Sequence, residues 1–494
     1  MGGSIIYYER IICMDIKSKT RIESDLLGER ELNDEHLYGV QTLRGLENFQ
    51  ISPFKLNHYP HFVRGLAMTK MAAARANEAL GVIQHECAKA IQQACQEIME
   101  GKHLEHFPVD MIQGGAGTTT NMNANEVIAN RALEIMGHEH GHYRYCSPND
   151  HVNVSQSTND AYPTAIHLGL YGTHLQFVTH VQQLVEAFEE KGKEFDHILK
   201  MGRTQLQDAV PMTLGQTFHG FASILREELP NLEHAATQLL TINMGATAIG
   251  TGICSEPGYR EKCTEALRDI TGWDIHSSGD LVAATSDTSH MIGYHGALKK
   301  LAVKLSKISN DLRLLSSGPR CGLGEIRLPA MQPGSSIMPG KVNPVIPEVM
   351  SQIAYKVIGN DVCVTLAGEA SQLELNAMEP IMAQCCFESA SYLMSGMDTL
   401  RERCIIGIEA NEENCRKHVQ ESLGVVTALN PFIGYKNATK VAKEAVATGK
   451  SISEIVIEKG LLTQEELNKI LSPENMIRPV LLDIKPREDK GYDQ

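Results

Sequence analysis

Aromatic residues are scarce in this chain of 494 residues. They make up 5% of it, and Trp273 is the single tryptophan, beside 20 methionines. This scarcity argues against all-β sandwiches and against surfaces that bind nucleic-acid bases by stacking. It favours a helical protein with aliphatic cores. The length allows about three domains and a large core.

Positive charge is also in short supply. The chain carries 45 Lys and Arg residues against 60 Asp and Glu residues, a formal net charge of −15. Non-specific nucleic-acid binding needs a basic face, so this function is excluded. One uncharged stretch, His234 to Ser255, is long enough to cross a bilayer, but Gln238 and Asn243 make it too polar for that role.

Cysteine pairs and a secretory leader are missing as well. The 12 cysteines are scattered, with no CxxC pair and no spacing typical of a zinc site. Adjacent Cys385 and Cys386 lie in an apolar helical pattern, which indicates buried free thiols. Glu9 and Arg10 interrupt the apolar N-terminal stretch, and no small-residue cleavage site follows. We therefore expect a reduced, cytoplasmic protein.

Helical periodicity is abundant. Apolar residues recur at spacings of three and four within 177–188, 218–239 and 291–315, and Pro230 is expected to kink the second segment. The third segment is an unbroken seam of the kind found in helix bundles. Further long helices are expected after Pro347 and from Glu379 to Ile408. The sequence predicts a mainly α fold built on an elongated bundle that oligomerises.

Three domains are expected from this pattern. Residues 1–154 would form an N-terminal, mostly helical domain, and residues 155–410 a central five-helix bundle. Residues 411–494, with short helices and turn signals, would form a small C-terminal helical domain.

Four polar segments, 114–126, 155–160, 202–211 and 334–348, stand out from the helical pattern. The first two place Gly, Ser, Thr and Asn just before a helical run. There they would either receive an anion or simply cap the helix. The fourth has two Gly and three Pro, so it is expected to be a loop between long helices, and such loops are usually functional. It lacks the GK[ST] of a phosphate loop and the helical SxxK of a Ser–Lys hydrolase.

These segments resemble the active-site regions of the aspartase/fumarase superfamily, in its order and at its spacing. The matching stretches are GAGTTTNMNANE, SQSTNDAYPT, MGRTQLQDAVPMTLGQ and GSSIMPGKVNP. The resemblance extends from Arg21 to Thr463 and is greatest to the aspartase branch. It implies a three-domain fold whose central long-helix bundle merges into a homotetramer core. It also implies that each active site is built from three chains.

The resemblance implies an elimination that releases fumarate, and in the aspartase branch the substrate is L-aspartate and the leaving group ammonia. A base removes a Cβ proton, and the resulting aci-carboxylate needs preorganised hydrogen-bond donors. Ser335 matches the base, and Lys341 with backbone N–H groups of its loop would stabilise the alkoxide. By the same motif match, the residues implied in substrate binding are Thr118, Ser157, Thr158, Asn159, Thr204, Gln205, Ser336, Lys341 and Asn343.

Two positions bear on the choice between branches. Fumarases of this fold normally carry His where this chain has Gln205, and Gln cannot act as an acid or base. Glu348 would support the site from behind the substrate contacts, or would simply favour a helix start by its charge. The alternatives are a class II fumarase acting on L-malate and a helical scaffold without activity. The resemblance implies no required cofactor. Some aspartases respond to Mg²⁺, but no carboxylate cluster here indicates a metal site.

Overall fold

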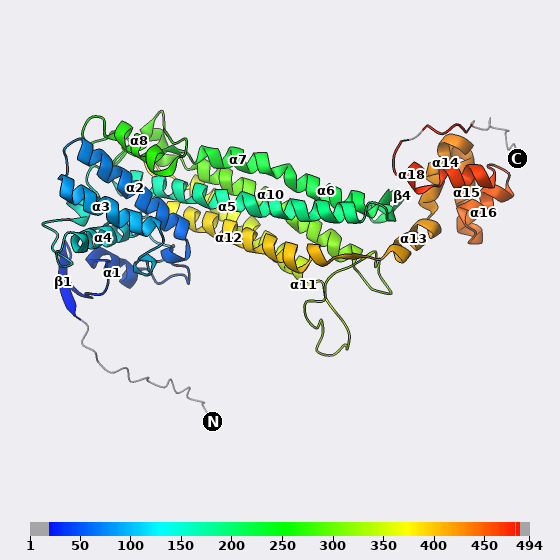
Figure 1. Ribbon diagram of the computed structural model, residues 1–494, viewed down its shortest axis with the longest axis horizontal. Helices are drawn as coiled ribbons and strands as arrows, with labels where there is room; N and C mark the ends of the chain where they lie inside the picture. Colours follow the sequence, from blue (N-terminus) through cyan, green and yellow to red (C-terminus); the bar gives the residue numbers. More distant parts are fainter. Residues whose placement is uncertain (1–18, 480, 485–494) are drawn as a thin grey trace, which may run out of the picture. The chain divides into compact units, whose positions relative to one another are not determined.

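The computed structural model describes residues 19–479 and 481–484, and these form a mainly helical protein (Figure 1). The predicted mainly α fold is thereby confirmed. By contacts the chain divides into two compact units. The first unit takes Met1–Leu175, Glu233–Gly296 and Asn360–Ser389, and the second takes Gln176–Leu232, Ala297–Gly359 and Ala390–Gln494. The division into three domains stays a prediction.

Five helices contribute residues to both units. They are α5 (Thr158–Glu194), α7 (Glu228–Gln238), α10 (Ser289–Leu315), α11 (Val345–Glu369) and α12 (Glu379–Arg403). The predicted helical segments at 177–188 and 291–315 lie within α5 and α10, so both are confirmed. The segment expected to reach Ile408 ends as an α-helix at Arg403 and continues as a 3₁₀ turn, Ile405–Gly407.

Proline breaks the helix predicted at 218–239 instead of kinking it. The structure has α6 (Leu214–Arg226) and then α7, separated at Glu227. Pro230 lacks an N–H, and its ring clashes with the carbonyl four residues earlier, that of Arg226. The α6 helix therefore ends at Arg226.

The first unit contains short strands and the N-terminal helices. Its other elements are β1 (Thr20–Asp25), β2 (Gly28–Asn33), α1 (Val40–Asn48), α2 (Pro60–Ala79), α3 (His85–Met99), α4 (Thr118–Ile135), β5 (Thr241–Ile242), α8 (Tyr259–Thr271), β6 (His276–Ser277) and α9 (Leu281–Ser286). Strands β1 and β2 form an antiparallel hairpin, and β5 pairs with β6 in parallel.

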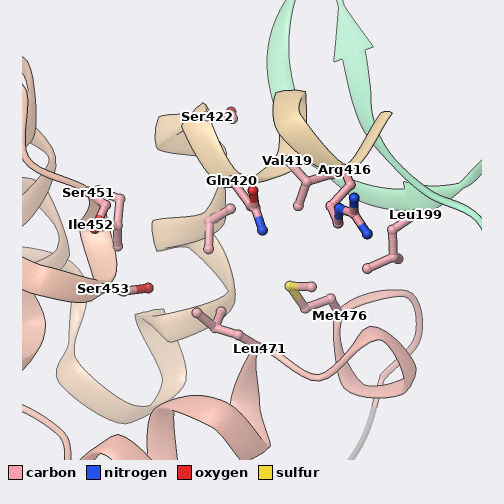
Figure 2. A pocket seen from close by; sticks show the side chains of 11 residues that line it. Leu199, Arg416, Val419, Gln420, Ser422, Ser451, Ile452, Ser453, Leu471 and Met476 are labelled. Carbon is pink, nitrogen blue, oxygen red and sulfur yellow. The ribbon is translucent and has the colours of Figure 1, made fainter. Parts of the chain in front are cut away.

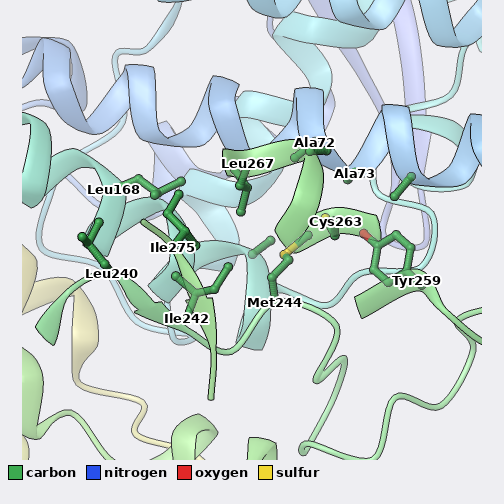
Figure 3. Close-up of a cluster of buried hydrophobic side chains, with 13 residues drawn as sticks. Ala72, Ala73, Leu168, Leu240, Ile242, Met244, Tyr259, Cys263, Leu267 and Ile275 are labelled. Atoms are coloured by element: carbon green, nitrogen blue, oxygen red, sulfur yellow. The ribbon is translucent and has the colours of Figure 1, made fainter. Parts of the chain in front are cut away.

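An apolar core holds α2, α5 and α8 together in the first unit. Ala72 and Ala73 of α2 face Leu267 and Cys263 of α8 (Figure 3). The small side chains permit close helix packing. At Gly65 of α2, a Cβ would lie 2.2 Å from the carbonyl oxygen of Ala165 on α5, so only glycine fits there.

The second unit combines a hairpin with the C-terminal helices. Its remaining elements are β3 (Leu199–Thr204), β4 (Gln207–Thr213), β7 (Ile326–Arg327), β8 (Glu409–Ala410), α13 (Glu412–Glu421), α14 (Val426–Ile433), α15 (Tyr435–Thr448), α16 (Ile452–Glu458), α17 (Gln464–Ile470) and α18 (Pro473–Met476). Strands β3 and β4 are antiparallel, as are β7 and β8. An apolar cluster that includes Leu429, Val441 and Ile455 holds the C-terminal helices together.

Two expectations about side chains and membranes can be compared with the described residues. Cys385 and Cys386 are buried and are thiols and not half-cystines, as predicted. In the part of the chain that the structure describes, no helix has the length and apolar character needed to cross a bilayer.

Candidate active site

Thr118 is the first residue of α4, and its side chain is exposed. The turn before it depends on Gly117, which has a φ of 87° and packs against the ring of Tyr162, leaving no room for a Cβ. The Thr118 hydroxyl donates to the carbonyl of Gly115 at 2.8 Å and keeps its oxygen as an acceptor. The N–H groups of Thr118 and Asn121 donate to the carbonyls of Gly115 and Gly117, and that of Thr120 donates to the side chain of Gln113. The exposed Thr118 hydroxyl at the positive end of the helix dipole is therefore the group that this turn offers to a carboxylate.

Ser157, Thr158 and Asn159 lie at the N-terminus of α5 and are half-buried. The Ser157 hydroxyl accepts from the backbone N–H of Asn159 at 3.2 Å. Asn121, in the first turn of α4, donates to the Thr158 hydroxyl at 3.2 Å. The structure thus joins the starts of α4 and α5, and with them Thr118 and the 157–159 segment.

Two buried ionisable residues, Lys70 and Asp160, fix the position of the 157–159 segment by hydrogen bonds. Lys70 of α2 donates to the side-chain oxygens of Asn153 and Gln156, at 3.0 and 2.9 Å. Asp160 accepts from the N–H groups of Ser157, Gly245 and Thr247. Burial lowers the pKa of Lys70 to about 7 and raises that of Asp160 to about 6. Neither residue was singled out from sequence. The visible signal was a Lys within the small, apolar α2 pattern.

Thr204 and Gln205 lie at the tip of the β3–β4 hairpin in the second unit, and both are exposed. Gln205 and Leu206 form the two-residue turn with φ values of 54° and 61°. Positive φ at both central residues is the signature of a type I′ turn, which matches the twist of the strands. Gln205 therefore lies at the tip because of the turn itself, in a backbone conformation that non-glycine residues rarely adopt.

A buried carboxylate anchors the hairpin. Glu325 accepts from Arg203 at 2.7 Å, and its other oxygen lies 3.3 Å from the ammonium of Lys200. His418 of α13 is 3.0 Å from the same carboxylate. Glu325 is fully buried, so loss of this one side chain would leave two cations without their partner.

Ser335 lies in an irregular loop between β7 and α11, as the Gly and Pro content predicted. Its hydroxyl oxygen accepts from the backbone N–H of Ile337 at 3.2 Å and of Met338 at 2.9 Å. Asn343 fastens the base of the loop by donating to the carbonyl of Gly334 at 2.8 Å. Two N–H groups aimed at one hydroxyl oxygen favour its deprotonated form.

The other predicted residues of this loop are accessible. Ser336 and Lys341 are exposed, and Asn343 is half-buried. Glu348 lies in the first turn of α11, where its charge suits the positive end of the helix dipole. The predicted residues of the second unit thus occupy the hairpin tip and the 334–343 loop.

The second unit also contains a cavity of about 420 Å³ between β3, α13 and the last helices. Figure 2 shows Arg416, Val419 and Leu471 around it. None of the predicted site residues lines this cavity, so it is separate from the candidate active site.

One group of side chains in the first unit could hold a metal ion. The ligand atoms of His103, Glu105 and His106 lie within 4.8 Å of one another. In the described residues this is the one such group. Sequence patterns did not single it out, and its Glu105 side chain is 72% exposed.

Comparison with known proteins shows similarity to lyases. A family model described as lyase matches residues 28–359, and one described as the C-terminus of fumarase C matches residues 425–478. Aspartate ammonia-lyase of Pseudomonas canavaninivorans is 55% identical over 96% of this chain and 100% of its own length. That of Escherichia coli K12 is 54% identical over 94% of this chain and 97% of its own length.

Solved structures agree with these similarities. A fumarate lyase/delta crystallin structure from Brucella melitensis, bound to cobalt, superimposes with a TM-score of 0.91 at 52% identity. The superposition covers 93% of this chain and 100% of the Brucella melitensis chain. Class II fumarase from Schistosoma mansoni superimposes with a TM-score of 0.85 at 33% identity, over 93% and 99% of the two chains.

Proposed function

Because the chain belongs to the aspartase/fumarase family of lyases, we propose that it catalyses the reversible deamination of L-aspartate to fumarate and ammonia. The observation that carries this choice is 54–55% identity to aspartate ammonia-lyases over nearly the full length of both chains. Gln205 favours the same choice, because an amide at this position cannot activate water as an acid or base.

Ser335 is the proposed base. As an alkoxide it takes the Cβ proton of L-aspartate, and the electron pair of that C–H bond moves into the adjacent carboxylate. The aci-carboxylate then collapses: the Cα–Cβ double bond forms and the C–N bond breaks. Fumarate and ammonia leave, and the proton stays on Ser335 until it is lost to solvent. The two N–H groups at the Ser335 oxygen, and the charge of Lys341, support the alkoxide.

The other predicted residues would bind the substrate. Lys341 and Asn343 would hold one carboxylate, with Ser336 beside them. The hydroxyls and amides at the starts of α4 and α5 and at the hairpin tip would bind the remaining polar groups, and these residues are Thr118, Ser157, Thr158, Asn159, Thr204 and Gln205. Glu348 would support the Ser335 loop from the start of α11. We propose that no cofactor is required and that Mg²⁺ at most activates.

A homotetramer with active sites shared between chains is part of the proposal. Its support is an apolar stripe on α11, formed by Tyr355, Val362 and Leu366, which are 59%, 58% and 63% exposed. Their spacing of seven and four residues puts them on one face of the helix. A second copy of the chain would cover such a stripe. The free cysteines of the described residues favour a cytoplasmic location.

A paired substrate assay tests the reaction. Fumarate is followed by its absorbance with L-aspartate and, in parallel, with L-malate, each with and without EDTA and added Mg²⁺. We expect turnover of L-aspartate that survives EDTA, and no turnover of L-malate. Activity on malate alone would identify a fumarase, and inactivity on both would favour a scaffold.

A further inference from the structure

A second polar cavity lies inside the first unit, directly behind the 157–159 segment. Its volume is about 160 Å³, and residues of α5, β5, α9, α10 and α12 line it. Asn243 is one of them, and its amide donates to the backbone carbonyl of Asn159 at 3.0 Å. A residue of the cavity wall, Asn243, is thus hydrogen-bonded directly to Asn159, a proposed substrate-binding residue.

Glu379 is the unusual member of the lining. It is the first residue of α12 and is 3% exposed, yet it borders this cavity. No hydrogen bond or ion pair to Glu379 occurs among the described residues. Burial raises its pKa to about 8. A buried carboxyl group without a partner is unfavourable, so a ligand that supplies a positive charge and hydrogen-bond donors would stabilise it.

Two donors of the cavity wall are already engaged by the protein. His167 contacts the carbonyl of Thr241 through Nδ1 at 3.1 Å, which makes Nδ1 the donor and leaves the Nε2 lone pair free. The amide of Asn243 donates to the backbone carbonyl of Asn159 and to the hydroxyl of Thr285. The Nε2 atom of His167 therefore remains as an acceptor.

The charged residues of the wall also favour a ligand that donates hydrogen bonds. Glu379 contributes a buried carboxyl group, and His290 contributes a second imidazole. Asp287 contributes an exposed carboxylate whose oxygens accept from the N–H and the hydroxyl of Ser289. Among the described residues that line the cavity there is no Lys or Arg. Acceptors and negative charge without a fixed cation favour a positively charged ligand that bears N–H groups.

The spacing of these groups suits such a ligand better than a metal ion. A metal ion with ligand bonds near 2 Å needs its ligand atoms in close proximity. Among the described residues only the His103 group gathers three such atoms within 4.8 Å. The cavity is also much larger than the space that one water needs.

We propose that this cavity binds ammonium or a short primary ammonium ion, with the Glu379 carboxylate as counter-ion and His167 and His290 as acceptors. The inference does not depend on the proposed reaction. If that reaction takes place, its own product would occupy the site, and the Asn243–Asn159 hydrogen bond would connect occupancy to substrate binding.

The test compares full-length wild type with Glu379→Gln, which preserves shape and removes the charge. Melting temperature is measured at pH 8 against ammonium, methylammonium, tetramethylammonium and sodium chlorides at constant ionic strength. A cation that binds only the folded state stabilises it by RT ln(1 + [cation]/Kd), so the rise in melting temperature with concentration gives an apparent Kd. We expect this rise with ammonium and methylammonium, while tetramethylammonium, which has no N–H group, behaves as sodium does.

In Glu379→Gln the apparent Kd for ammonium should rise at least tenfold. Glu265→Gln is the matched control, because Glu265 is exposed on α8 of the same unit and should respond as wild type. Ammonium bound at the catalytic centre would still act in Glu379→Gln, so an unchanged response there overturns the proposal. An ammonium response equal to that of sodium in wild type does so too.

A second variant covers the case in which Glu379→Gln fails to fold. His290→Leu removes one acceptor and fills part of the cavity while Glu379 stays in place. The same titration should show at least a tenfold weaker response to methylammonium. An apparent Kd equal to that of wild type would overturn the proposal.

Discussion

The basicity of Ser335 is the central chemical question at the scale of single residues. A free serine hydroxyl is a very weak acid, so its alkoxide exists at neutral pH only if the surroundings stabilise the charge. The N–H groups of Ile337 and Met338 both reach its oxygen. They belong to the same loop, so whatever orders the loop also prepares the base.

Replacement of Ser335 by Ala should lower kcat by between about 10²-fold and 10⁴-fold, because a positioned base contributes that range. The melting temperature should change little, since Ser335 donates no hydrogen bond to the protein in the described residues. The measurement is fumarate release from L-aspartate, together with a thermal scan. Ser336→Ala is the comparison, because it removes a proposed substrate contact and not the base, so it should raise KM more than it lowers kcat. Near-native kcat in Ser335→Ala would assign the base elsewhere.

Sequence motifs suggested the candidate residues but did not reveal which contacts hold them in place. Ser335, Thr118 and Ser157 carry recognisable motifs, although their roles remain predictions. Lys70 and Asp160 act through burial, and burial is a property of the folded chain. No local spacing links Lys70 to Gln156 or Asp160 to Gly245, so their contacts could not be predicted without the fold.

At the scale of elements, the long helices were predictable and the hairpin was not. The α10 seam repeats apolar residues at a fixed period, and that period alone specifies a helix. The β3–β4 turn uses Gln205 and Leu206 at positive φ, where Asn or Gly is the usual signal. The sequence therefore carries no recognisable turn signal at this position. The segment was expected only to join two helices.

An ion pair between α3 and α4 provides a test of helix packing in the first unit. Glu97 of α3 accepts from Arg131 of α4 at 2.6 and 3.0 Å and also contacts His103. The hydrogen bonds from Arg131 lower the pKa of Glu97 to about 2. A lowered pKa means that the stabilisation is complete above the unfolded-state pKa, near 4.3, and is lost as the pH falls towards 2.

Glu97→Gln should therefore lower the free energy of unfolding at pH 7 by an amount on the order of 3 kcal/mol, the equivalent of the pKa shift. The deficit should shrink as the pH falls below about 4.3. Thermal unfolding of both proteins between pH 7 and pH 3 measures it. Glu86→Gln, an exposed change on the same helix, should be nearly neutral. A deficit that is independent of pH would show that the charge of Glu97 is not what matters.

The charge of the whole molecule opposes its proposed substrate. A net charge of −15 repels a dicarboxylate at long range, so capture depends on local groups. The starts of α4 and α5 offer helix N-termini with hydroxyls, and the 334–343 loop offers Lys341. Sites assembled from several chains would gather these local donors while the remaining surface stays acidic.

Assembly is the property of the whole molecule that can be tested by one substitution. Val362 lies in the middle of the apolar stripe on α11 and is 58% exposed in the single chain. An unpaired carboxylate buried at an interface disfavours association by about 3–5 kcal/mol. Val362→Asp should therefore lower the molar mass measured by light scattering, and turnover of L-aspartate should fall with it. Val446→Asp, on α15 at 71% exposure, is the matched control and should preserve both. If Val362→Asp lost the tetramer but kept full turnover, each chain would contain a complete site, and the shared-site proposal would be wrong.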